Sequence, residues 1–162
     1  MSHKIKKSDV NRKYVFDEMS KRTKRSIEDL EHYVDSLDDH KAEQLCGKCS
    51  HYRKNGVYGF ISRGPEKWTI KTVNISKIYV RGINNHVNHF LSRNGWWLEN
   101  ISKDKSIPKL GEFKKHGDIH HRSMSLIAHK VGGKYGIVDG NHRAIKLACS
   151  GHKEFKLIFY RR

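Results

Sequence analysis

The stretch YGIVDGNHRAIKLACSGHKEFKLIFY, Tyr135–Tyr160, predicts a strand, a glycine turn, a helix and a second strand in succession. Residues 135–138 favour a strand that enters a core, and Gly140 allows a turn that other residues resist. The helix is predicted from apolar residues at helical spacing, namely Ala144, Ile145, Ala148 and Cys149. We expect Asn141 to cap this helix and Gly151 to end it.

This arrangement is suited to binding phosphate. The positive end of a helix dipole and the first backbone N–H groups point to one spot, here around Gly140 and Asn141. Arg143 lies in the first turn and can donate two hydrogen bonds to a phosphate. His142 has a proton affinity suited to general acid–base catalysis, and Asp139 can hold a metal ion or orient a neighbour.

Each of these residues also has a simpler interpretation. Asp139 and Asn141 are common turn and cap residues, and a lone histidine such as His142 often only covers an apolar helix. Arg143 can pair with a carboxylate elsewhere. Because all four lie together at one helix start, we favour a site.

The segment YGIVDGNHRAIKLA resembles the signature of the ParB/sulfiredoxin superfamily, in which a strand leads into a helix start that grips nucleotide phosphates. Gly140, His142, Arg143 and Leu147–Ala148 match that pattern. Lys146 stands where the family has a small residue, and we group it with the phosphate-binding residues. Upstream, VNISKIYV resembles the family's first strand.

The resemblance covers roughly residues 68–160 and implies an α+β fold. We expect a small mixed sheet with packed helices over 68–162, preceded by a basic helical region over 1–67. Members of this superfamily serve as CTP-dependent DNA clamps, nucleases, small-molecule kinases or sulfinic-acid reductases, so the fold does not decide the chemistry. Asn141 replaces the catalytic cysteine of sulfiredoxins, which argues against that activity.

Two other activities of the superfamily are disfavoured. Partition proteins continue into a helix-turn-helix domain, whereas we expect none after Arg162. A kinase needs an acidic residue near the motif, and Glu112 and Asp139 are the candidates.

The composition predicts a polyanionic partner. The 162 residues carry 33 Lys and Arg against 17 Asp and Glu, a net charge of +16. Such a surface attracts DNA or RNA, with DNA favoured, and attracts nucleotides. We expect no signal peptide, no membrane span and a cytoplasmic location.

The first 67 residues predict helices behind a basic, frayed arm at 1–7. One helix is expected over 8–22. A second begins after Ser26 and carries a stripe of apolar residues, Ile27, Leu30, Val34 and Leu37. This helix, extended over 26–45, is expected to pack on its own domain or on a second copy in a homodimer.

Cys46 and Cys49 form a CxxC pair in a turn-rich segment that resembles a zinc knuckle, with His51 as a third candidate Zn²⁺ ligand. A single pair is weak evidence, and a knuckle that folds without metal is the favoured interpretation. A redox pair is less attractive because no βαβ pattern surrounds it.

Between residues 68 and 138 the pattern predicts strands, a helix and a long loop. Alternation over 68–80 indicates strands, and 126–130 with 135–138 indicate a hairpin across Gly132–Gly133. A helix is expected over 84–93. Trp96 and Trp97 can stack on bases, but a core position for one ring and an edge position for the other is favoured.

The predicted loop holds a cluster of possible metal ligands, His116, Asp118, His120 and His121. These residues can bind a transition metal or assist phosphoester hydrolysis. A flexible basic loop on a nucleic-acid backbone explains them equally well.

The leading hypothesis is a DNA-associated nuclease or nucleotide hydrolase. His142 or His120 would act as general acid or base, and Asp139 or Asp118 would hold Mg²⁺ or Mn²⁺. A nucleoside triphosphate is a further expected ligand. The alternative is a non-catalytic nucleotide- or DNA-binding protein that modulates a nucleic-acid enzyme.

Overall fold

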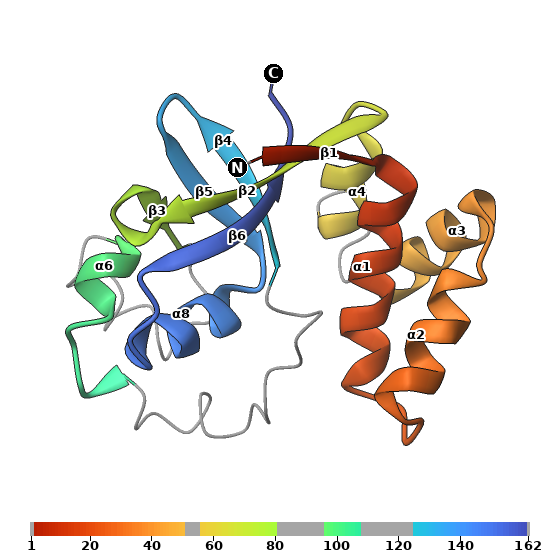
Figure 1. Cartoon of the computed structure of the whole chain (residues 1–162), viewed down its shortest axis with the longest axis horizontal. Helices are drawn as coiled ribbons and strands as arrows, with labels where there is room; N and C mark the ends of the chain where they lie inside the picture. Colours follow the sequence, from red (N-terminus) through yellow and green to blue (C-terminus); the bar gives the residue numbers. More distant parts are fainter. Residues whose placement is uncertain (1, 51–55, 81–95, 108–124, 162) are drawn as a thin grey trace. The chain divides into compact units, whose positions relative to one another are not determined.

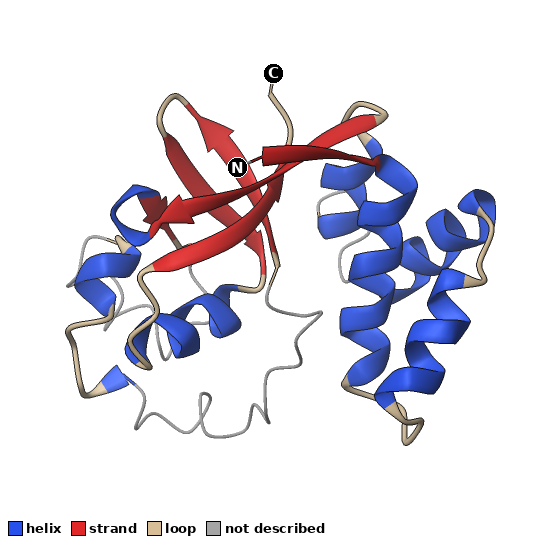
Figure 2. Cartoon of the chain, in the orientation of Figure 1, coloured by secondary structure: helices blue, strands red, loops and turns tan. Residues whose placement is uncertain are grey.

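The computed structural model describes residues 2–50, 56–80, 96–107 and 125–161 (Figure 1). The chain forms two compact units, Lys4–Thr69 and Ile70–Arg162, the second of which also includes Met1–His3. Helices and a mixed sheet are both present, which confirms the α+β class (Figure 2). The prediction that each part is a separate domain stays a prediction.

The sheet has six strands in the order β1-β2-β6-β4-β5-β3. Their bounds are Ser2–Lys6, Lys67–Asn74, Ile78–Tyr79, Leu126–Val131, Lys134–Asp139 and Glu154–Phe159 for β1 to β6. Strand β4 runs antiparallel to β5 and parallel to β6, and β3 runs parallel to β5. The predicted frayed arm at 1–7 is wrong, because Ser2–Lys6 form β1 and Lys7 begins helix α1.

The predicted hairpin of β4 and β5 is confirmed. Lys130 pairs with Tyr135 and Val131 with Lys134 across the turn, where Gly132 has φ of 61°. Gly136 lies beneath the Tyr79 ring, and a Cβ at this position would be 2.6 Å from that ring. A side chain at 136 would therefore separate β5 from β3.

Helix α8, Asn141–Cys149, contributes one side of the core of the 70–162 unit. Its buried residues Ala144, Ile145 and Ala148 belong to the same cluster as apolar residues of the sheet, including Leu126, Ile137, Leu157 and Phe159. The short helix α6, Leu98–Ile101, and the 3₁₀ helix η2, Ile75–Lys77, add Leu98, Ile101 and Ile75 to that cluster. The predicted helix and its end at Gly151, which has φ of 100°, are confirmed.

The two tryptophans between β3 and α6 are both half-buried. Trp96 packs against the core cluster, and the Trp97 ring meets the Tyr79 ring edge-on at 5.9 Å between centroids. The helix predicted over 84–93 lies outside the described residues.

Residues 4–69 contain helices α1 (Lys7–Ser20), α2 (Ile27–Asp35), α3 (Asp39–Cys49) and α4 (Val57–Ser62). The predicted cap of α2 is confirmed, because the Asp29 backbone N–H donates to Ser26 Oγ at 3.1 Å. The continuous helix predicted over 26–45 is wrong. It ends after Asp35, and Asp38 caps the next helix by accepting a hydrogen bond of 2.7 Å from the Lys41 N–H.

The apolar stripe of α2 is used inside the chain. Leu30 and Val34 are fully buried and Leu37 is 8% exposed, and α2 and α3 both pack on α1. This stripe is therefore covered, and nothing supports a homodimer through the 26–45 segment. No helix within the described ranges is long and apolar enough to cross a membrane.

Candidate functional site

The turn between β5 and α8 is built around Gly140. Its φ of 100° and ψ of 27° lie in the left-handed region, which glycine adopts without strain. A Cβ at this position would lie 2.6 Å from Leu126 Cδ2 and 2.8 Å from Arg143 Nη2. The glycine thus allows the backbone to turn beneath the Arg143 guanidinium.

Arg143 and Asp139 form an ion pair across this turn. Arg143 Nη2 donates to Asp139 Oδ2 at 3.2 Å, and the two side chains are 14% and 13% exposed. Asp139 ends β5 and Arg143 lies in the first turn of α8, so the pair joins strand to helix. The carboxylate fixes the position of the guanidinium and offsets part of its charge.

His142 and Asn141 lie in the same first turn, and both are half-buried. The prediction that Asn141 caps the helix is wrong, because Gly140 is the cap residue and Asn141 is the first helical residue. Lys146 lies in the last turn of α8, about 4.5 Å further along the axis than Arg143. We name the turn formed by residues 139–143 the phosphate turn. Lys146 is not part of it, because it lies in the last turn of α8.

The phosphate turn combines a positive helix end, an arginine and a histidine. An anion placed there would meet the Arg143 guanidinium and the helix dipole, and would compete with the Asp139 carboxylate. A divalent metal on Asp139 would instead compete with Arg143 for the same carboxylate. The geometry therefore suits an anion better than a metal ion.

Several predicted site residues cannot be placed relative to this turn. His51, Glu112, His116, Asp118, His120 and His121 lie outside the described residues. Their predicted roles in metal binding and catalysis stay predictions.

The CxxC pair lies in a helix and not in a turn-rich knuckle, so that prediction is wrong. Cys46 is fully buried and Cys49 half-buried in the last turns of α3, and neither forms a disulfide. Gly47 does not break the helix. The Tyr58 ring packs against it, 3.4 Å from the position of a Cβ. Whether this pair binds zinc stays a prediction, because His51 lies outside the described residues.

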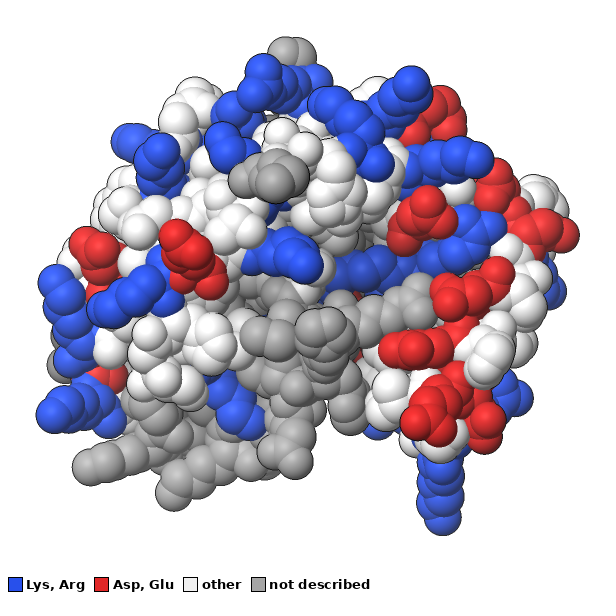
Figure 3. All heavy atoms as spheres, in the orientation of Figure 1, with Lys and Arg blue, Asp and Glu red and all other residues white. Residues whose placement is uncertain are grey.

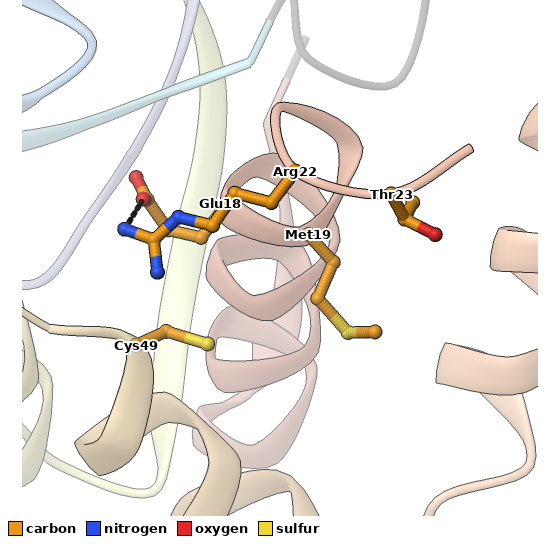
Figure 4. A pocket seen from close by; sticks show the side chains of 5 residues that line it. All are labelled: Glu18, Met19, Arg22, Thr23 and Cys49. Carbon is orange, nitrogen blue, oxygen red and sulfur yellow. Dashed lines mark ion pairs between the residues drawn. The ribbon is translucent and has the colours of Figure 1, made fainter. Parts of the chain in front are cut away.

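A cavity of about 270 Å³ opens beside Cys49, in the 4–69 unit (Figure 4). Its lining comes from the end of α1, the residues after it and Cys49: Glu18, Met19, Arg22, Thr23 and Cys49. Glu18 is nearly buried and pairs with Lys21 at 3.0 Å and Arg22 at 3.6 Å. Sequence reasoning missed this cavity, because it depends on how α1 and α3 pack.

The environment of Cys49 keeps its thiol protonated. Burial and the negative charge of Glu18 raise the pKa of Cys49, and Arg22 only partly opposes them. Redox-active CxxC cysteines have a lowered pKa, so the raised pKa of Cys49 does not favour that role. Among the described residues, no three His, Cys, Asp or Glu come together as a metal site.

A scan against protein-family models finds no match, and searches of curated proteins and of solved structures find none either. The resemblance to the ParB/sulfiredoxin superfamily therefore rests on the sequence motif and the upstream strand segment described above, and stays a prediction.

Proposed function

We propose that this protein binds nucleic acid, with DNA favoured, and that the phosphate turn handles a phosphate group of the nucleic acid or of a nucleotide. The distribution of charge supports nucleic-acid binding. Residues 70–162 carry 18 Lys and Arg against 6 Asp and Glu, a net charge of +12. Residues 1–69 carry 15 against 11, a net charge of +4. The excess therefore belongs mainly to the unit that contains the phosphate turn.

The position of Arg143 supports the proposal that the phosphate turn binds a phosphate group. The guanidinium is already held at the positive end of α8, so little side-chain entropy is lost when a phosphate binds there. Asp139 acts in this account as a positioning residue that a phosphate displaces. A ParB/sulfiredoxin-like fold of residues 68–162 is part of the same proposal, and the hairpin followed by Gly140 and α8 supports it.

A non-catalytic binder is the version that the geometry supports best, because the carboxylate of Asp139 is occupied by Arg143. The second version is a nuclease or nucleotide hydrolase. The place of His142 beside Arg143 favours it, since a proton donor and a phosphate ligand would share one helix turn. In that version Mg²⁺ or Mn²⁺ would supply Lewis-acid chemistry, and His142 would move a proton.

Two substitutions of opposite expected sign test the phosphate turn. Arg143→Gln removes the charged donor and should weaken DNA or nucleotide binding about ten-fold or more. Asp139→Asn removes the competing carboxylate and should strengthen binding. If Arg143 only joins the strand to the helix, both variants lose stability and neither changes affinity.

Product analysis separates the two versions. The protein would be incubated with Mg²⁺ or Mn²⁺, plasmid DNA and each nucleoside triphosphate, beside His142→Ala and the control His40→Ala. His40 is an exposed histidine at the start of α3. Products that disappear only with His142→Ala establish an enzyme, whereas the absence of products with DNA still bound establishes a binder.

A further inference from the structure

Four cations lie where β4 turns into β5, and the positive charge of a fifth, Lys71 in β2, acts on one of them, Lys130. They come from five different segments, and we name them the hairpin-end cluster: Lys71, Lys77, Lys130, Lys134 and Arg161. Lys130 is half-buried and the other four are exposed. None of them belongs to the phosphate turn.

The strand register brings Lys130, Lys134 and Arg161 together, and Lys77 directly precedes Ile78, the partner of Tyr135. Leu126 pairs with Leu157 and Ile127 with Ile158, so the same register continued places Lys130 level with Arg161. Across the hairpin, Val131 pairs with Lys134. Burial and the positive charges of Arg161, Lys71 and Lys77 lower the pKa of Lys130, as expected for cations that share one neighbourhood.

Aromatic rings support two of the cations. Lys130 Nζ lies 5.7 Å from the ring centroids of Tyr135 and Phe159, and Lys134 Nζ lies 5.3 Å from that of Trp97. A ring holds an ammonium group in place without neutralising its charge. Within the described part of the chain, the five cations form no ion pair with a carboxylate. Figure 3 shows Lys and Arg gathered over the β4–β5 hairpin and the C-terminal end of the chain.

We propose that the hairpin-end cluster is a second contact for the phosphate backbone of nucleic acid, separate from the phosphate turn. This inference rests on the proposed function. The cluster offers several positive charges whose binding to phosphates would release counterions from the nucleic acid. No carboxylate has to be displaced, in contrast to the phosphate turn.

The spacing of the two sites suits an extended polyanion. Strand β5 runs from Lys134 in the cluster to Asp139 in the phosphate turn, a span of about 17 Å at the rise of a strand. Phosphates follow each other at about 3.4 Å along the axis of one DNA strand, so roughly five nucleotides cover this span.

Nucleic acid fits the cluster better than an anionic membrane does. Trp97 is half-buried and lies beside Lys134, and aromatic rings next to cations are a common means of binding bases. Insertion into lipid needs exposed apolar side chains. Among the described residues, Val131 is the one large apolar side chain that is exposed, at 53%.

The salt dependence of DNA binding tests the proposal. Lys71→Ala/Arg161→Ala removes two cations of the cluster, and Lys103→Ala/Lys105→Ala removes two exposed cations of the same unit that lie outside it. Binding of a fluorescent DNA duplex would be followed by anisotropy between about 50 and 200 mM salt. We expect the cluster variant to lower the slope of log K against log salt by about 1.8, since each phosphate contact contributes about 0.9. The control variant should keep the wild-type slope.

Three other outcomes would overturn or change the proposal. Equal slopes for the two variants, with wild-type DNA binding intact, would overturn the cluster alone. A wild-type protein that binds no DNA at low salt would overturn the proposed function as well. Binding to phosphatidylserine vesicles that only the cluster variant loses, without DNA binding, would show that a membrane is the partner. Lys77→Ala/Lys134→Ala serves as a second cluster variant if the first does not fold.

Discussion

In residues 4–69 several cations are joined to carboxylates, whereas in residues 70–162 a group of them lies beside other cations and aromatic rings. Arg12 bonds Asp9 and Asp39, Lys13 pairs with Asp17, and Glu18 accepts from Lys21. The hairpin-end cluster has no such partners within the described residues. The paired cations of the first unit therefore stabilise that unit, whereas the cations of the hairpin-end cluster remain available to bind an external polyanion.

The two units also differ in what their glycines do. Gly140 holds a left-handed turn with a side chain directly above it, and Gly47 lies within helix α3 against the flat ring of Tyr58. The same substitution should therefore have opposite effects in the two places.

The largest expected effect is that of Gly140→Ala. The methyl group would overlap Leu126 and Arg143, and φ of 100° strains any residue with a Cβ. We expect the free energy of unfolding to fall by about 2–4 kcal/mol. Chemical denaturation followed by circular dichroism measures this, and a loss below about 0.5 kcal/mol would contradict the described turn.

Gly47→Ala is the matched change in the other unit. A Cβ there would make an ordinary contact of 3.4 Å with the Tyr58 ring, and alanine favours a helix interior. We expect the free energy of unfolding to stay level or rise by up to about 1 kcal/mol. A loss comparable to that of Gly140→Ala would show that residues 46–49 are not helical.

Removing charge should affect DNA binding only in the second unit. Lys24→Ala/Lys41→Ala takes two exposed cations from residues 4–69, and we expect it to leave the salt slope unchanged. The cluster variant should lower the slope by about 1.8. Equal reductions for both variants, measured by anisotropy, would mean that the whole surface attracts DNA and that the contrast between the units is wrong.

The thiols provide a smaller test that applies to both units. Burial raises the pKa of Cys49 and of Cys149, and the nearby Glu18 and Asp104 respectively add to this effect. We expect both to react with iodoacetamide more slowly than a free thiol at pH 8. The rate should increase as the pH rises beyond the ordinary thiol value of 9.0. Fast alkylation of Cys49 at pH 7, seen by peptide mass mapping, would instead indicate a redox-active pair.

The smallest expected effect concerns Asp39, which Arg12 contacts at 2.7 Å. The hydrogen bond from Arg12 lowers the pKa of this carboxyl below its ordinary value of 3.8. A lowered pKa in the folded state contributes stability above the unfolded value, and that stability is lost as the pH falls through the folded value. Asp39→Asn should therefore lower Tm slightly at pH 7, and the difference should shrink as the pH falls below 3.8 and vanish only once the pH is below the folded-state pKa. A constant difference at all pH values would show that charge is not involved.

Local patterns made the central part of the fold predictable. The hairpin, Gly140 and helix α8 follow from glycines and from apolar spacing within about 30 residues, as does the cap at Ser26. Their determinants are short-range, since turn conformation and helix amphipathicity depend on neighbouring residues.

The predictions failed where the structure depends on residues that are far apart in the sequence. Strand β1 is polar and mostly exposed, so its sequence shows no alternating apolar pattern. It forms because it pairs with another strand of the sheet. The end of α2 at Asp35 is set by the Asp38 cap, whose signal is weaker than the apolar stripe before it. The hairpin-end cluster could not be predicted either, because its members are spread over 90 residues of sequence and come together only in the folded sheet.

The most direct test of the account is the affinity of Asp139→Asn for DNA, beside wild type and Arg143→Gln. We expect tighter binding when the competing carboxylate is removed and weaker binding when the guanidinium is removed. Unchanged affinity in both variants, with unfolding free energies that fall together, would show that the ion pair only fastens β5 to α8 and that the phosphate turn binds nothing.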